Sequence, residues 1–265
     1  MIHIDKDACI GCGLCVKDCI AKNITLSDGH AEPYFDCFLC GHCVAVCPQN
    51  AITIEEYDMD DVKPYVPEAF QLSPEILLSA IKYRRSIRHY TPESVSETAI
   101  DRLVQAGRYT ATAKNTQGCR FIIVQEQLDT LKSLIWGHIG EAIEAAKNVE
   151  TFPPQLEDYR RFYRDHKRHP ENDYLFRNAP AVVIISAQNP VDAALAAQNM
   201  ELMAVSLGLG VLYNGYLNRA IMDSPECLKW LGTTDQPPQV TMLLGHPAVH
   251  YARTAPRRKA DVIRR

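Results

Sequence analysis

Residues 9–20 read CIGCGLCVKDCI and residues 37–48 read CFLCGHCVAVCP, and these two stretches decide the fold of the N-terminal part of the chain. Each stretch places four cysteines at spacings of two, two and three intervening residues. The second copy follows the first at a constant offset, so that Cys9 corresponds to Cys37 and Cys19 to Cys47. Because a tight loop of this kind can turn three soft thiolates toward one metal centre, the duplication predicts two related metal sites.

The spacing is that of the cysteine runs that hold two [4Fe-4S] clusters in bacterial ferredoxins, where the fourth cysteine of each run ligates the other cluster. The first cluster is therefore predicted to be held by Cys9, Cys12, Cys15 and Cys47. The second cluster is predicted to be held by Cys37, Cys40, Cys43 and Cys19. The first run departs from the pattern at Ile20, where the run normally continues with proline, as Pro48 does in the second copy.

Structural zinc is the alternative, because four thiolates from paired C-x2-C units can hold Zn²⁺ tetrahedrally. Such zinc sites use two pairs for each ion, whereas this chain has two runs of four cysteines. The sequence therefore favours iron–sulfur clusters over zinc. Two cysteines lie outside the runs, Cys119 and Cys227, and we interpret both as small packed side chains rather than nucleophiles.

Length and composition divide the chain of 265 residues into two domains. We assign residues 1–57 to a 2[4Fe-4S] ferredoxin domain, residues 58–72 to a linker, and residues 73–265 to a second domain. The linker assignment rests on a run of aspartates followed by Pro64 and Pro67, although an extended arm packed on the second domain is an equal alternative.

Charge and hydropathy exclude several classes of protein. The formal net charge of −4 argues against a general nucleic-acid binder. No apolar run approaches the roughly 18 residues of a membrane span, and the N-terminus leads directly to the first ligand without a signal peptide. Together with the thiolate chemistry, these features lead us to expect a cytoplasmic protein with no membrane partner.

The second domain contains helices and strands in alternation. Ser73 and Pro74 predict a helix start, Ser94 and Glu97 predict a capping box at the next helix, and a long apolar helix is expected over residues 192–207. A helix that is apolar all round belongs in a core or in a subunit interface. Short apolar runs predict buried strands at residues 121–124, 181–185 and 240–244.

Two groups of cations stand out in this domain. Residues 84–88 read RRSIR directly after an apolar helix face, which suits anion binding but also fits an ordinary basic helix end. Residues 160–169 are denser in cations, and we favour a solvated helix face there over a lid that attracts anionic substrates.

The order and spacing of several segments give the second domain a resemblance to a known family. The segments are residues 84–88, 111–121, 178–180, 207–210 and 257–259. Residues 73–265 resemble the nitroreductase-like flavoproteins, and the whole chain resembles ferredoxin–nitroreductase fusions. The resemblance implies an α+β sandwich, a homodimer, and FMN bound at the subunit interface.

The resemblance also implies which residues bind FMN. Arg84 and Ser86 would meet the phosphate and ribityl chain, with Arg85 in the same segment, and Arg88 would lie nearer the pyrimidine edge. The residues expected to close on the phosphate are Arg257, Arg258 and Lys259. The residues expected to reach the flavin ring from the partner subunit are Thr112, Asn115 and Gln117. The residues expected along the ring near N5, mostly through backbone groups, are Tyr213, Asn214 and Gly215.

This chain departs from the family pattern within the polar loop. Residues 111–113 read ATA where the family usually has Pro-Ser-Ala or similar, and Gly118-Cys119 stands where Pro-Trp is common. A bulky ring is thus replaced by a small thiol, which changes the expected shape of the pocket.

These features predict an FMN-dependent oxidoreductase that receives electrons through its own clusters. The expected substrate is a small electron-poor molecule such as a nitroaromatic, quinone or enone, and the expected donor is a reduced ferredoxin or another low-potential carrier. No side chain is expected to act as an essential nucleophile, and Tyr213 is a candidate proton donor. Two alternatives stay open: an electron-transfer or redox-sensing relay without turnover of its own, and direct use of NAD(P)H.

Overall fold

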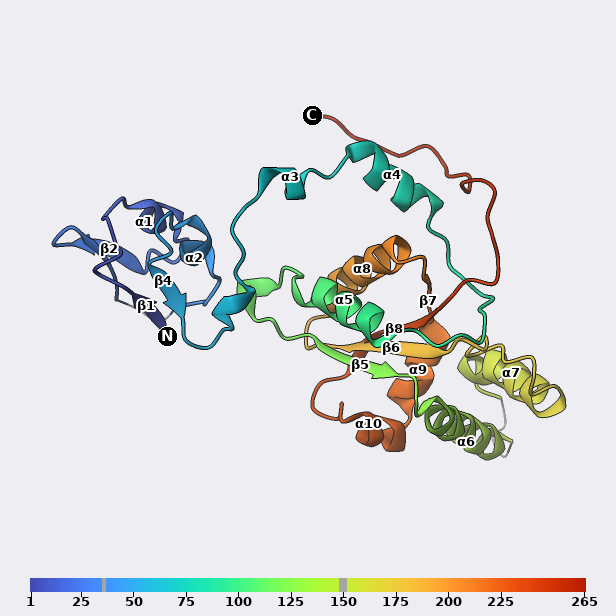
Figure 1. Cartoon of the computed structure of the whole chain (residues 1–265). Coiled ribbons are helices and arrows are strands. Elements are labelled where there is room, and N and C mark those ends of the chain that lie inside the picture. The colour runs from blue at the N-terminus through green and yellow to red at the C-terminus, as the bar shows by residue number, and fades with distance from the viewer. Residues whose placement is uncertain (35–36, 148–151) are drawn as a thin grey trace. The chain divides into compact units, whose positions relative to one another are not determined.

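The computed structural model describes residues 1–34, 37–147 and 152–265 (Figure 1). It divides into two compact units, the first made of Met1–Leu72 with Thr112–Thr116 and the second of Ser73–Ala111 with Gln117–Arg265. In the described part of the chain, no helix combines the length and apolar character needed to cross a bilayer.

The first unit is built as a duplicated motif. Strand β1 (Ile2–Ile4) pairs antiparallel with β4 (Ile52–Ile54), and β2 (Ile24–Ser27) pairs antiparallel with β3 (His30–Pro33). One short helix follows each cysteine loop, α1 (Leu14–Asp18) and α2 (His42–Val46), and these helices pack against each other. After β4 come η1 (Met59–Asp61) and α3 (Pro67–Phe70).

Equivalent glycines start the two short helices of this unit. Gly13 and Gly41 are the N-cap residues of α1 and α2, with φ values of 73° and 74°. This left-handed conformation is open to glycine at little cost and disfavoured for other residues. The repeat in sequence therefore produces a repeat in backbone conformation.

The second unit is organised around a four-stranded antiparallel sheet with the order β5-β6-β8-β7. The strands are β5 (Arg120–Val124), β6 (Ala181–Ser186), β7 (Gly210–Tyr213) and β8 (Pro238–Gly245). All six residues of β6 are buried because this strand lies inside the sheet and is covered on both faces. The three strands predicted from apolar runs are confirmed to within a few residues.

Helices cover both faces of this sheet (Figure 1). On one face, α5 (Glu97–Arg108) and α8 (Pro190–Ser206) pack on Val183 and Ile185 of β6. The other face packs Val182 and Ile184 against α6 (Leu128–Ala146), α7 (Glu157–Arg168), α9 (Gly215–Asp223) and α10 (Pro225–Leu231). The alternation along β6 therefore splits the core in two, and the expected α+β sandwich is confirmed.

The remaining helical segments are α4 (Pro74–Tyr83), η2 (Ala113–Asn115) and η3 (Pro154–Leu156). The predicted cap of α4 is confirmed, since the Ser73 hydroxyl accepts the Ile76 amide at 3.3 Å. The predicted cap of α5 is wrong, because Ser96 rather than Ser94 accepts the first free amide, that of Ala99. Both serines precede the same apolar pattern, so sequence spacing could not separate them.

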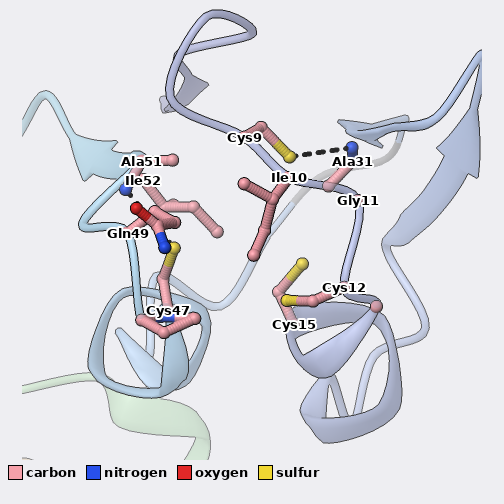
Figure 2. Close-up of a pocket in the computed structure, with 12 residues that line it drawn as sticks. Cys9, Ile10, Gly11, Cys12, Cys15, Ala31, Cys47, Gln49, Ala51 and Ile52 are labelled. Carbon is pink, nitrogen blue, oxygen red and sulfur yellow. Dashed lines mark hydrogen bonds between the residues drawn. The ribbon is translucent and has the colours of Figure 1, made fainter.

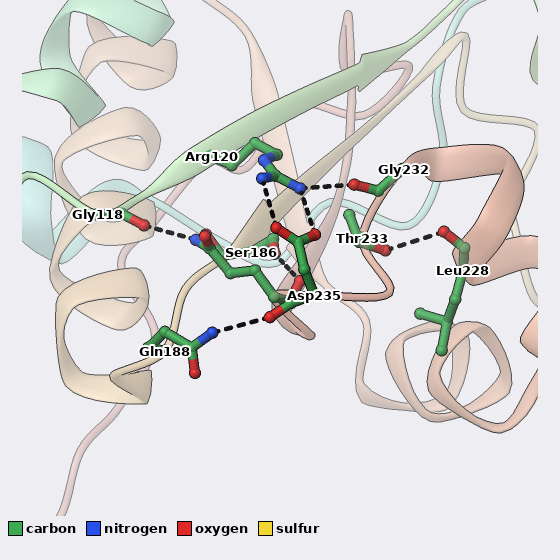
Figure 3. A network of polar contacts seen from close by, with 9 residues as sticks. Gly118, Arg120, Ser186, Gln188, Leu228, Gly232, Thr233 and Asp235 are labelled. Atoms are coloured by element: carbon green, nitrogen blue, oxygen red, sulfur yellow. Dashed lines mark hydrogen bonds and ion pairs between the residues drawn. The ribbon is translucent and has the colours of Figure 1, made fainter.

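A polar network anchors the start of β5 (Figure 3). The Arg120 guanidinium binds both carboxylate oxygens of Asp235, at 3.0 and 3.1 Å, and donates to the Gly232 carbonyl. The Gln236 amide donates to the carbonyls of Gly118 and Ser186. These contacts fix the chain where it emerges from the polar loop and enters the sheet.

Candidate cluster and flavin sites

Four cysteines from both copies of the motif line one cavity in the first unit (Figure 2). Three of them come from the loop before α1 and from α1 itself, and the fourth follows α2. They are the residues predicted to hold the first cluster, namely Cys9, Cys12, Cys15 and Cys47. A cavity lined by four thiols that converge from two loops suits a cubane cluster.

The cavity depends on a close approach between two glycines. Gly11 has a φ of 63°, and a Cβ atom at this position would lie 2.1 Å from the carbonyl oxygen of Gly29. Real Cβ atoms do not come so near, so the first cysteine loop requires glycine here. In the second copy the equivalent position is Leu39, which adopts a similar φ of 52°.

Backbone amides donate to four of the cysteine sulfurs. The Asn23 amide lies 3.3 Å from Cys19 Sγ and the Ala51 amide lies 3.3 Å from Cys47 Sγ, so both copies use the residue four positions on. The other two bonds differ, since Cys9 Sγ accepts from Ala31 whereas Cys37 Sγ accepts from the Leu39 amide. Hydrogen bonds to the sulfurs help to set the reduction potential of a cluster. The different donors at Cys9 and Cys37 therefore predict different reduction potentials for the two clusters.

Three of the four residues predicted to hold the second cluster, Cys37, Cys40 and Cys43, lie near one another at the start of α2. Burial, with smaller contributions from the neighbouring Cys37 and Cys40, raises the pKa of the Cys43 thiol to about 11. In the first copy, burial likewise raises the pKa of Cys15, with smaller contributions from Cys12 and Cys9. Because iron binds thiolates, cluster insertion must displace protons from these buried groups, and assembly becomes pH-dependent.

The second unit contains an open pocket where β7 meets α9. Its lining includes four residues predicted to bind flavin, Arg88 and the consecutive Tyr213, Asn214 and Gly215. The Asn214 side chain is occupied by structural roles, since its Oδ1 accepts from the Leu217 amide at 2.9 Å and its Nδ2 donates to the Leu175 carbonyl at 2.7 Å. A ligand would therefore meet this turn through its backbone, which fits the predicted mode of contact.

Tyr213 keeps its proton in this pocket. Burial, together with the nearby Glu201 carboxylate, raises the pKa of its phenol well above the ordinary value. A neutral phenol with a raised pKa can donate a hydrogen bond at every physiological pH. Tyr213 is 39% exposed, and its hydroxyl forms a side-chain hydrogen bond with Glu201.

Arg84 is engaged in a buried ion pair. Its Nη1 lies 3.0 Å from Oε1 of Glu201, which is 2% exposed in the middle of α8. A buried carboxylate needs such a partner, so Arg84 has a structural role besides the predicted contact with phosphate. Of its neighbours, Arg85 stacks near the Tyr251 ring at 5.5 Å and Ser86 forms a bridge with Val211.

The other predicted flavin contacts do not line this pocket. Asn115 donates to the Leu39 carbonyl at 2.9 Å and to the Tyr57 hydroxyl at 3.3 Å, all within the first unit, and Thr112 belongs to the same unit. Gln117 is the first residue of Gln117–Arg265, which belongs to the second unit, and it has a positive φ of 47°. The tail residues form no helix or strand and are exposed. They are Arg257, Arg258 and Lys259.

Comparisons with known proteins agree with both units. Residues 81–246 match the nitroreductase family, and residues 8–52 match the 4Fe-4S dicluster domain. The chain belongs to the nitroreductase family. The N-terminal part of this family member is 47% identical over 47 residues to a component of the ion-translocating oxidoreductase complex of Methanosarcina acetivorans, covering 17% of this chain and 18% of that protein.

Two similar proteins cover the nitroreductase part. The FMN reductase (NADPH) of Bacillus subtilis is 26% identical over 172 residues, which is 64% of this chain and 66% of the reductase. The chain thus spans just under two thirds of the length of this curated relative. A nitroreductase with bound FMN from Bacteroides fragilis has the same fold, with a TM-score of 0.56 at 22% identity over 71% of this chain and 98% of that one.

The sequence did not point to several side chains that line the pocket of this nitroreductase-family unit. They are Asp158, Phe162, Tyr174, Arg177, Tyr216 and Arg219. Arg177 directly precedes the Asn-Ala-Pro segment, and Arg219 lies one helical turn after Gly215, so both are close to quoted motifs. No spacing in the sequence marked these residues, because they become neighbours only when residues 158–177 pack against the start of α9.

Proposed function

We propose that this protein is an FMN-dependent oxidoreductase that reduces a small electron-poor molecule with electrons received through two [4Fe-4S] clusters. The observation that carries the proposal is that one chain holds a cavity lined by four cysteines and a pocket lined by Arg88 and the Tyr213–Gly215 turn. The FMN named for the nitroreductase of Bacteroides fragilis and for the reductase of Bacillus subtilis supports the choice of flavin.

The residues of each site fit the group assigned to it. Four soft thiols with amide donors at Cys9 and Cys47 suit an iron–sulfur cube. In the pocket, Arg88 supplies positive charge and the 213–215 turn supplies backbone groups. When bound, FMN accepts electrons one at a time and passes a pair to a substrate. A cation near the pyrimidine edge stabilises the charge of the reduced cofactor, which is the role we assign to Arg88.

The chemistry of the acceptor defines what the pocket must provide. Reducing a nitro group to a nitroso group consumes two electrons and two protons and releases water, and a quinone takes up the same number to form a hydroquinone. We propose water or the Tyr213 hydroxyl as the source of one proton; the raised pKa keeps this phenol protonated but also makes it a weak acid. No nucleophile is needed for either reaction.

We further propose a homodimer with FMN at the subunit interface. Helix α4 has no buried residue, and Ile76 and Leu78 on it are 68% and 51% exposed. On α8, Val191 and Leu195 are 60% and 47% exposed. Exposed apolar residues on two packed helices are typical of a surface covered by another subunit. Sedimentation of the holoprotein should give a dimer, and a monomer with bound FMN would contradict this arrangement.

The decisive experiment is anaerobic reduction of the purified holoprotein by a low-potential reduced ferredoxin. We expect the cluster absorbance to bleach first, the flavin absorbance to follow, and both to recover when a nitroaromatic or a quinone is added. Clusters that reduce while the flavin stays oxidised would contradict the internal relay.

A relay protein without turnover is the second candidate, supported by the similarity of residues 8–52 to a dicluster domain alone. It predicts flavin reduction without reoxidation by any nitroaromatic or quinone acceptor. Direct use of NAD(P)H is supported by the NADPH-dependent reductase of Bacillus subtilis. It predicts flavin reduction by NAD(P)H in a variant that lacks both clusters.

A further inference from the structure

We propose that the pocket at the start of α9 selects flat substrates that carry an anionic group, and that Arg177 and Arg219 bind this group. This inference rests on the proposed function, because it names the substrate class of the same pocket. The family resemblance assigns neither arginine to the cofactor.

The first argument is the charge balance of the pocket. Its lining includes the guanidinium groups of Arg88, Arg177 and Arg219 but, among the described residues, a single carboxylate, that of Asp158. This carboxylate is already paired, because it accepts from the Tyr216 hydroxyl at 2.8 Å and from Arg161 at 3.1 Å. Within residues 1–34, 37–147 and 152–265, neither Arg177 nor Arg219 forms an ion pair. The pocket therefore carries excess positive charge that an anion can neutralise.

The second argument is that stacking holds the Arg177 side chain, while none of its guanidinium N–H groups donates a hydrogen bond within the described part of the chain. Its guanidinium carbon lies 3.7 Å from the centroid of the Tyr174 ring, and Tyr174 stacks in turn on Phe162 at 4.6 Å. At this separation the flat guanidinium lies against the face of the ring, so its in-plane N–H groups remain available. A fixed fork of N–H donors is the arrangement that recognises a carboxylate bidentately.

The third argument is the shape of the wall. Phe162 meets Tyr216 edge to face at 5.1 Å, and the Tyr159 hydroxyl donates to the Tyr216 carbonyl at 2.7 Å. The bond from the Asn214 amide to the Leu175 carbonyl ties the 213–215 turn to the segment that carries Tyr174. Flat rings pack well against such aromatic walls, so a planar anion fits better than a compact one.

The dense cations of α7 do not provide this recognition. Arg160 pairs with Glu157 at 2.7 Å and Arg161 pairs with Asp158 at 3.1 Å, each within the helix. These pairs support the solvated helix face favoured from the sequence. The anion-binding charge comes instead from Arg177 and Arg219, which lie outside that run.

The test compares two acceptors of similar size and shape, the anion 4-nitrobenzoate and the neutral 4-nitrobenzamide. Anaerobically reduced holoprotein is mixed with each acceptor, and flavin reoxidation is followed as a function of concentration. We expect half-saturation by the anion at a concentration about ten-fold lower, as expected for a charge-assisted hydrogen bond. In the double variant Arg177→Gln, Arg219→Gln the ratio should fall to near one.

Three further variants sharpen the test. Arg160→Gln removes a cation from α7 and should leave the ratio unchanged. Arg219→Gln changes a single side chain on α9 and should fold normally with a reduced ratio. Arg177→Lys keeps the charge but loses the planar fork, and an intermediate ratio is expected.

The outcomes separate the inference from the proposed function. Turnover of both acceptors with no preference for the anion, or a preference that survives in the double variant, overturns the inference alone. Loss of FMN from the double variant also overturns it, since the arginines would then bind the cofactor phosphate. If neither acceptor is reduced, the proposed function fails. Calorimetric titration of the oxidised holoprotein with benzoate and benzamide then decides the inference, which requires about ten-fold tighter binding of benzoate that the double variant loses.

Discussion

The cluster unit and the pocket unit collect their functional side chains over very different lengths of chain. The cavity of the first unit takes three cysteines from residues 9–15 and one from the equivalent run that ends at Cys47. The pocket of the second unit takes Arg88, Arg177 and Arg219 from segments separated by dozens of residues, around a four-stranded sheet. The first site is thus fixed mainly by local turns, whereas the second depends on the packing of a whole domain.

The largest expected effect of this difference lies in the cluster unit. Cys47→Ser removes the one ligand of the first cluster that comes from the other copy. We expect the iron content to fall from about eight to about four atoms per chain. We also expect the first unit to become less stable, because a small unit with a small core relies on its metals for stability. Cys119→Ser, outside both runs, is the control and should keep all of the iron. Iron and sulfide assays measure the effect, and full iron retention in Cys47→Ser would contradict the ligand assignment.

Substitution of the glycines in the two cysteine loops, Gly11 and Gly41, gives the next largest effect. Gly11→Ala places a methyl group 2.1 Å from the Gly29 carbonyl oxygen and adds left-handed strain, so we expect a loss of about 3 kcal/mol and slower cluster assembly. Gly41 has a φ of 74°, and a Cβ atom added there would meet no atom within 4 Å. Gly41→Ala therefore adds only the backbone strain of about 1 kcal/mol. Denaturant titrations of the holoprotein, followed at the cluster absorbance, compare the two. Equal losses would show that the close approach to Gly29 does not matter.

In the pocket unit, a single substitution should lower the free energy of unfolding by less, because many contacts stabilise this unit. Glu201→Gln removes the charge that pairs with Arg84 but keeps the size and one acceptor, so we expect a loss of about 2 kcal/mol. For a domain of this size that corresponds to a drop in Tm of roughly 4–8 °C. Asp165→Asn, in an exposed pair with Arg164 at 3.7 Å, is the matched control and should change little. Similar Tm values for both variants would show that the buried pair adds no stability.

Several features of both units were predictable from sequence. Thiolate spacing predicted which four cysteines share the first cavity, because the geometry of a tight loop is set within a few residues. The three buried strands followed from short apolar runs, and Ser73 marked the start of α4. The basic segment at residues 84–88 was found, but two of its three arginines play different parts, since Arg84 pairs with the buried Glu201 while Arg88 lines the pocket.

What the sequence by itself determined is the local chemistry: two cysteine loops, the residues that begin helices, and the strands that must be buried. What only the tertiary structure decided is which distant side chains become neighbours, such as Arg177 and Arg219, or Asn115 and the Leu39 carbonyl. The physical reason is the range of the forces involved. Turn conformation and metal ligation act within a few residues of chain, whereas the position of a cation beside a pocket depends on how whole helices pack against the sheet.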